Sequence, residues 1–103
     1  MLSEHQMTEH TRSLSQVIRK GEKAMRDALR EVQWRREKMQ NALRYCGKEI
    51  RSNQAIAARQ QICELDRLIA YTTLALSNLP EEKIARAKAI QFAIDTILKL
   101  GAD

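Results

Sequence analysis

The feature that most constrains the fold of this chain is a helical pattern of apolar residues that no proline interrupts between Ser13 and Ile50. At 100° per residue, these side chains occupy about 100° of arc on one helix face. They are Leu14, Ile18, Met25, Leu29, Val32, Met39, Leu43, Cys46 and Ile50. A continuous helix over these residues is about 57 Å long, which exceeds the width of a compact domain of about 100 residues. We therefore expect a helix that protrudes from the domain or pairs with a second chain.

Two further helices are expected in the second half of the chain. A row of residues at alternating steps of three and four is typical of coiled-coil core positions, and it predicts a second helix over about residues 54–77. This row consists of Ile62, Leu65, Ile69, Thr72, Leu76 and Leu79. Pro80, followed by Glu81 and Glu82, is typical of a first helical turn and predicts a third helix over about residues 80–100.

The order of these elements predicts an all-α fold. Gly47 and Asn53 mark the expected turn after a first helix over about residues 13–50. Short connections favour antiparallel neighbours. We expect a flexible segment over residues 1–12 and a single helical domain over residues 13–103, in which a third helix folds back on an antiparallel hairpin of long helices. This arrangement is a three-helix, coiled-coil-like bundle. An alternative is that the first two helices form one continuous rod, which pairs only in a dimer.

The apolar surface of the second and third helices indicates self-association. The second helix has a second apolar strip, made of Ile56, Cys63, Ala70 and Leu74. A helix that is apolar on two sides is usually covered from both, so we expect it to be the middle helix. Phe92 projects from the third helix opposite Ile90. We expect a homodimer with contacts at Phe92, Ile56 and Leu74.

Positive charge is concentrated on one face of the first helix. The formal net charge of the chain is +5 at pH 7, and its excess of Lys and Arg lies in the first half. Cations and two aromatic residues share an arc of about 120° opposite the apolar stripe. We predict that this arc is the partner-binding surface, and it consists of Arg19, Lys23, Arg26, Arg30, Trp34, Lys38, Tyr45 and Lys48.

This basic face is compatible with three interpretations. An acidic surface of a partner protein would be attracted by the cations, with Trp34 as an anchor. Alternatively, nucleic acid would bind through its phosphates, with an aromatic ring stacked on a base. The third interpretation is a purely structural subunit whose basic face is only solvated. We expect the first, a non-enzymatic interaction protein that binds and regulates a protein partner.

Two residues interrupt the apolar stripe of the first helix. Arg36 lies between Val32 and Met39, where a charged side chain must reach solvent or find a partner. In an antiparallel hairpin, Asp66 is the expected partner. Gly21 either allows another helix to approach closely or kinks the helix, and the sequence leaves both possibilities open.

Several classes of function have no support in the sequence. We find no motif for catalysis, metal binding or cofactor binding, so we expect a protein that is not an enzyme and has no small-molecule substrate. The N-terminus does not resemble a signal peptide, and no run approaches the ~20 apolar residues that cross a bilayer. Two cysteines in such a chain indicate a reducing compartment. We therefore expect a cytoplasmic protein without membrane contact.

Overall fold

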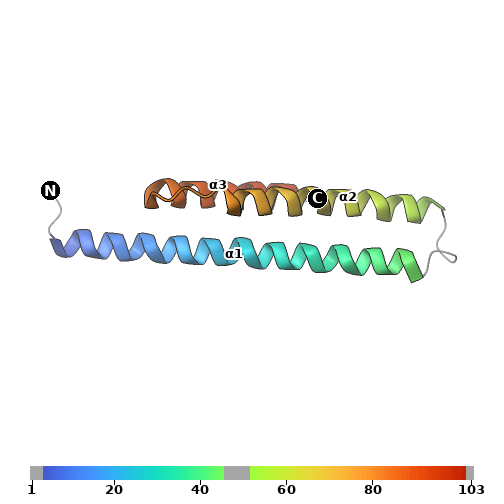
Figure 1. Cartoon of the computed structure of the whole chain (residues 1–103), viewed down its shortest axis with the longest axis horizontal. Helices are drawn as coiled ribbons and strands as arrows, with labels where there is room; N and C mark the ends of the chain where they lie inside the picture. Colours follow the sequence, from blue (N-terminus) through green and yellow to red (C-terminus); the bar gives the residue numbers. More distant parts are fainter. Residues whose placement is uncertain (1–3, 46–51, 102–103) are drawn as a thin grey trace.

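The computed structural model describes residues 4–45 and 52–101, and these residues form three α-helices (Figure 1). The helices are α1 (Glu4–Tyr45), α2 (Ser52–Ser77) and α3 (Lys83–Gly101). The described ranges contain no strand, so the prediction of an all-α fold is confirmed. The molecule is elongated, with extents of 68 × 21 × 17 Å.

The prediction that the first helix begins near residue 13 is wrong, because α1 begins at Glu4. Residues 4–12, which we expected to be flexible, are helical. The apolar pattern starts only at Leu14, but no glycine or proline lies between Glu4 and Lys20 to end the helix. Helical propensity therefore extends α1 beyond its packed stripe. The expected end at Ile50 and the expected turn around Gly47 lie outside the described residues.

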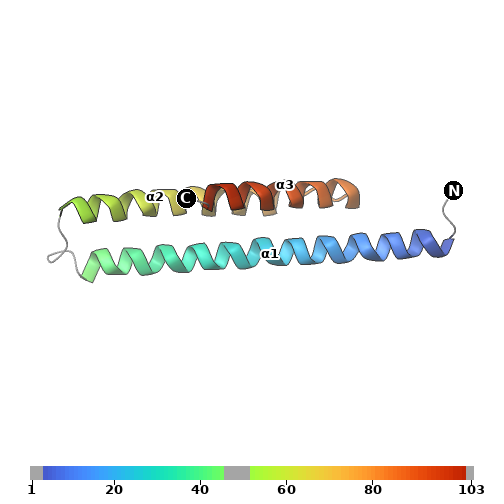
Figure 2. The same cartoon turned by 180° about the vertical axis from the view of Figure 1, so that it is seen from behind.

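The first two helices form an antiparallel hairpin, so the alternative of one continuous rod is wrong (Figure 1). Arg36 Nε donates a hydrogen bond to Asp66 Oδ1 across the hairpin, as the sequence predicts. α3 then runs back in the direction of α1, and all three pairs of helices are in contact. Figure 2 shows that α3 ends about midway along the hairpin. At its N-terminal end, α1 extends beyond both α2 and α3 (Figure 1). The rest of the molecule is a three-helix bundle over one half and a two-helix hairpin over the other.

The buried core lies in the three-helix half. Met25 of α1 packs with Ile90 and Ala93 of α3. Leu68 and Thr72 of α2 are also buried, and the Thr72 hydroxyl donates to the Leu68 carbonyl oxygen at 2.8 Å. This internal bond satisfies the buried hydroxyl group. The three helices therefore share one small core.

The start of α3 differs from the sequence prediction. Pro80 precedes the helix, which begins at Lys83, and Glu82 caps it. The backbone amides of Ile84 and Ala85 donate to the Glu82 carboxylate at 3.1 and 2.7 Å. These hydrogen bonds hold the pKa of Glu82 below its ordinary value, because they stabilise the charged form. A capping carboxylate at residue 82 thus moves the helix start three residues beyond the predicted residue 80.

Gly21 lies where α1 and α3 pack closely against each other. A β-carbon on Gly21 would overlap Cγ2 of Ile90 and would lie 3.8 Å from Cδ1 of Ile94. The helix continues through this position without a break. Of the two possibilities that the sequence left open, close packing is therefore the role of Gly21.

We expect Gly21→Ala to lower the free energy of unfolding by about 1–3 kcal/mol, because the added methyl group overpacks against Ile90. This loss exceeds the gain of up to about 1 kcal/mol in helix propensity. In an Ile90→Ala background, which removes the overlapping methyl group, Gly21→Ala should be neutral or stabilising. Urea denaturation followed by circular dichroism measures both steps of the cycle. If Gly21→Ala lowered the free energy of unfolding equally in the wild-type and Ile90→Ala backgrounds, overpacking against Ile90 would not be the cause.

The capping role of Glu82 predicts a pH-dependent stability. Its depressed pKa means that its contribution is present at neutral pH and is lost as the pH falls below about 4, where glutamate protonates. We expect Glu82→Gln to lower the melting temperature at pH 7 and to have a smaller effect at pH 3. Glu81→Gln is the matched control, since no backbone hydrogen bond to Glu81 appears among the described residues. If the difference in melting temperature between wild type and Glu82→Gln were as large at pH 3 as at pH 7, this capping role would be wrong.

Candidate functional site

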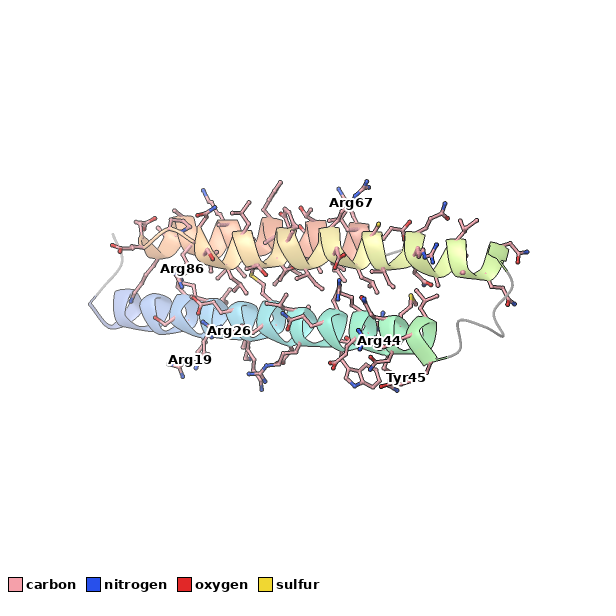
Figure 3. The ribbon with its side chains drawn as sticks, turned by 45° about the vertical axis from the view of Figure 1, so that its right-hand side comes forward. Arg19, Arg26, Arg44, Tyr45, Arg67 and Arg86 are labelled. Carbon is pink, nitrogen blue, oxygen red and sulfur yellow. The ribbon has the colours of Figure 1, made fainter. Side chains whose placement is uncertain are left out.

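The predicted partner-binding residues form one exposed surface of α1, which we call the basic outer face. Its members within the described residues are Arg19, Lys23, Arg26, Arg30, Trp34, Lys38 and Tyr45, and all are exposed. In Figure 3, Arg19 and Tyr45 point away from α2 and α3. Lys48 lies outside the described residues. The hairpin therefore leaves the whole described length of this surface open to solvent.

Several cations of the basic outer face have no internal counterion. Arg26 Nη2 lies 3.5 Å from Glu22 Oε2, and Arg86 of α3 also bonds to Glu22 at 2.5 Å. By contrast, no ion pair in the described part of the chain includes Arg19, Lys23 or Arg30. Within the described residues these three charges have no ion-pair partner, so they are available to an external anion.

Trp34 is held by a neighbouring cation. The Lys38 ammonium nitrogen lies 4.0 Å from the centre of the Trp34 ring. A cation–π contact at an exposed site is worth about 0.5–1 kcal/mol. This contact covers one face of the indole, while 55% of the residue remains exposed. The ring is thus partly ordered before any partner binds.

A groove adjoins the basic outer face in the two-helix half, and sequence reasoning missed it. This groove, which we call the hairpin groove, has a volume of about 370 Å³. Its lining residues are Trp34, Arg35, Lys38, Met39 and Ala42 of α1 and Gln61 and Leu65 of α2. The only sequence feature that could have predicted the groove was helix length. A third helix of about 20 residues cannot cover a hairpin whose first helix is about twice as long.

The predicted oligomer contacts are exposed on α2 and α3. Leu74 and Phe92 are 61% and 70% exposed, and they line one hollow of about 240 Å³ between the two helices. Ile56 is 54% exposed but lies 18 residues before Leu74 on α2. The structure therefore brings Leu74 and Phe92 together, whereas Ile56 lies near the start of α2, away from both.

The second apolar strip of α2 is not covered, which corrects the prediction that α2 is the middle helix. Ile56, Cys63, Ala70 and Leu74 are all exposed. α3 must contact α1 as well as α2, so it packs against the neighbouring side of α2 near Ala75. Two neighbours in a three-helix bundle cover adjacent sides of a helix, and its outer side stays open.

Three other kinds of feature could indicate a function among the described residues: metal-binding groups, membrane-spanning helices and cysteine thiols. They contain no group of three or more His, Cys, Asp or Glu that could hold a metal ion. Across the same residues, no helix is both long and apolar enough to cross a membrane. Cys63 is exposed, like the other residues of the second apolar strip of α2.

Comparison with known proteins adds no assignment. The chain matches no protein-family model, no curated protein and no solved structure. The candidate function therefore depends on the two surfaces described above, the basic outer face and the exposed α2–α3 strip.

Proposed function

We propose that this chain is a non-enzymatic interaction protein that binds and regulates a partner protein with an acidic surface, through the basic outer face of α1. The observation that carries the proposal is that Arg19, Lys23 and Arg30 have no ion-pair partner among the described residues, on a face that also carries the Lys38–Trp34 contact. Unpaired cations attract an acidic surface and orient it, while a tryptophan supplies a binding hot spot.

The surroundings of Trp34 favour a protein over nucleic acid. Lys38 lies over one face of the indole, so a stacking base would have to displace it or use the other face. The ring also lines a groove whose other members include the apolar residues Met39, Ala42 and Leu65. Apolar surface beside cations suits the side chains of a protein better than it suits a phosphate backbone.

Charge reversal on the basic outer face tests the proposal. We expect Lys23→Glu with Arg30→Glu to abolish capture of partner proteins from a lysate of the source cells, because both cations lack internal counterions. The matched control is Arg67→Glu with Lys99→Glu, since these exposed cations of α2 and α3 give the same change in net charge. Mass spectrometry quantifies the captured proteins, and circular dichroism checks that helicity is retained. Equal capture by both double variants would contradict the proposal.

The wild-type protein and the same two double variants also test whether the partner is nucleic acid instead of protein. Fluorescence polarisation of labelled generic DNA and RNA is measured at about 50 and about 200 mM salt, where binding through several phosphates weakens steeply. We expect no tight binding at the lower salt concentration. Micromolar binding that collapses with salt, and that Lys23→Glu with Arg30→Glu abolishes, would replace the protein partner with nucleic acid.

We also propose that two copies pair through the exposed strip of α2 and α3. The chain has 8314 Å² of accessible surface, whereas a compact monomer of its mass exposes about 5,900 Å². A standard interface buries about 1,600 Å² in total, so the excess can supply one. The charged residues of α2 are Arg59, Glu64, Asp66 and Arg67, whose formal charges cancel. The α2 part of this face therefore carries no net charge that would repel a second copy.

Light scattering after size exclusion measures the pairing. We expect a mass near twice 11.9 kDa for wild type. Leu74→Asp with Phe92→Asp should give a monomer, because a carboxylate buried in an apolar interface is costly. Ile84→Asp is the control, since Ile84 is exposed but does not line the Leu74–Phe92 hollow. A wild-type protein that is monomeric at about 100 μM would contradict the dimer.

A further inference from the structure

We propose that the hairpin groove accepts an acidic amphipathic helix of the partner protein, which would continue the path of α3 along the hairpin. This inference rests on the proposed function and adds the way in which the partner is held. The bundle would then have three helices along its whole length, the third supplied in part by α3 and in part by the partner.

The position of α3 indicates that the hairpin groove suits a helix. On α1, Gly21 contacts Ile90 and Ile94 of α3. Residues at steps of seven from Gly21 lie on nearly the same side of α1. These residues are Ala28, Arg35 and Ala42, and the last two line the hairpin groove. One side of α1 therefore faces α3 in the three-helix half and the open groove in the other half.

On α2, steps of seven residues likewise connect the side that faces α3 with the groove. Ala75 packs against the core that α3 shares, and Leu68, seven residues earlier on α2, is buried, as is Thr72. Gln61 lies seven residues before Leu68, and Leu65 lies seven before Thr72. Both Gln61 and Leu65 line the hairpin groove. The groove is thus bounded by the continuation of the two helix sides that hold α3, and no residue of α3 lines it.

The residues that line the groove determine which side chains a bound helix must have. Met39, Ala42 and Leu65 offer apolar contact, and the small side chain of Ala42 allows a helix to approach closely. Arg35 and Lys38 provide cations on the α1 side. Arg35 bonds only to Glu31 of its own helix, at 2.7 Å and in an exposed position, and such a pair is worth about 0.3–0.5 kcal/mol. A carboxylate from a bound helix can therefore compete for Arg35.

A second copy of this chain is a poor occupant of the groove. The charged residues of α3 are Lys83, Arg86, Lys88, Asp95 and Lys99, so this helix is itself basic. α1 is basic along its outer face, and like charges across an interface cost several kcal/mol. The occupant that fits is a helix with an apolar stripe and acidic residues beside it, bound in the helix-in-groove mode.

Synthetic helices test this inference directly. The probe is a stapled peptide of about 14 residues, or about 21 Å of helix, with leucines on one stripe and glutamates beside it. A staple is needed because short helices are marginal in water. Trp34 is the only tryptophan in the chain and lines the groove, so its emission reports occupancy. We expect saturable binding that changes this emission, and binding at least about tenfold weaker when lysine replaces glutamate.

Two groove-filling variants locate the bound peptide. Ala42→Phe fills the hairpin groove and should abolish binding of the labelled peptide, measured by anisotropy. Gln33→Phe is the control, because Gln33 is also exposed and lines a separate hollow with Arg36 and Asp66. The inference is overturned by an absence of saturable binding up to about 100 μM, by equal affinity for the lysine peptide, or by equal loss in both variants.

Partner capture separates this inference from the proposed function. If Ala42→Phe leaves capture from the lysate intact while Lys23→Glu with Arg30→Glu abolishes it, the groove inference fails and the proposed function stands. If both variants leave capture intact, both fail. Loss of capture in both, together with normal capture by Gln33→Phe, supports both proposals.

Discussion

The contact between Gly21 and Ile90 is the constraint on which the arrangement of the molecule depends. Because residue 21 has no side chain, α3 can lie close to α1, and Ile90 becomes almost fully buried with Met25 and Ala93. This contact sets the position of α3 along the hairpin. With 19 residues, α3 then ends about midway, so its length and its docking point together leave the hairpin groove open.

The two halves of the molecule are held together by different interactions. The three-helix half contains the shared core of Met25, Ile90 and Ala93, where burial of apolar surface supplies the stability. The two-helix half has the Arg36–Asp66 ion pair, whose side chains are 38% and 48% exposed. A pair so exposed contributes about 0–1 kcal/mol. It therefore specifies the register of the hairpin more than it stabilises it, and this half has the most to gain from a bound partner.

Charge is distributed unevenly over the surfaces, and this separates their proposed roles. The basic outer face of α1 carries cations without internal counterions, so it suits an acidic partner. The formal charges of α2 cancel, and its exposed apolar strip suits a second copy of the chain. Trp34 and Lys38 belong both to the basic outer face and to the hairpin groove. One partner can therefore use the cations for attraction and the groove for apolar contact.

The sequence by itself determined the three helices and the exposure of Phe92, because helical periodicity is a local property. It favoured the antiparallel hairpin with its Arg36–Asp66 pair, and the structure decided against the continuous rod. It did not predict the start of α1, since residues 4–12 carry no apolar pattern, or the cap at Glu82, whose geometry depends on the path of the preceding loop. Only the tertiary structure decided the role of Gly21, the open strip of α2 and the hairpin groove. These depend on which sides of two helices a third one covers and on where it ends, and periodicity within one helix contains no information about either.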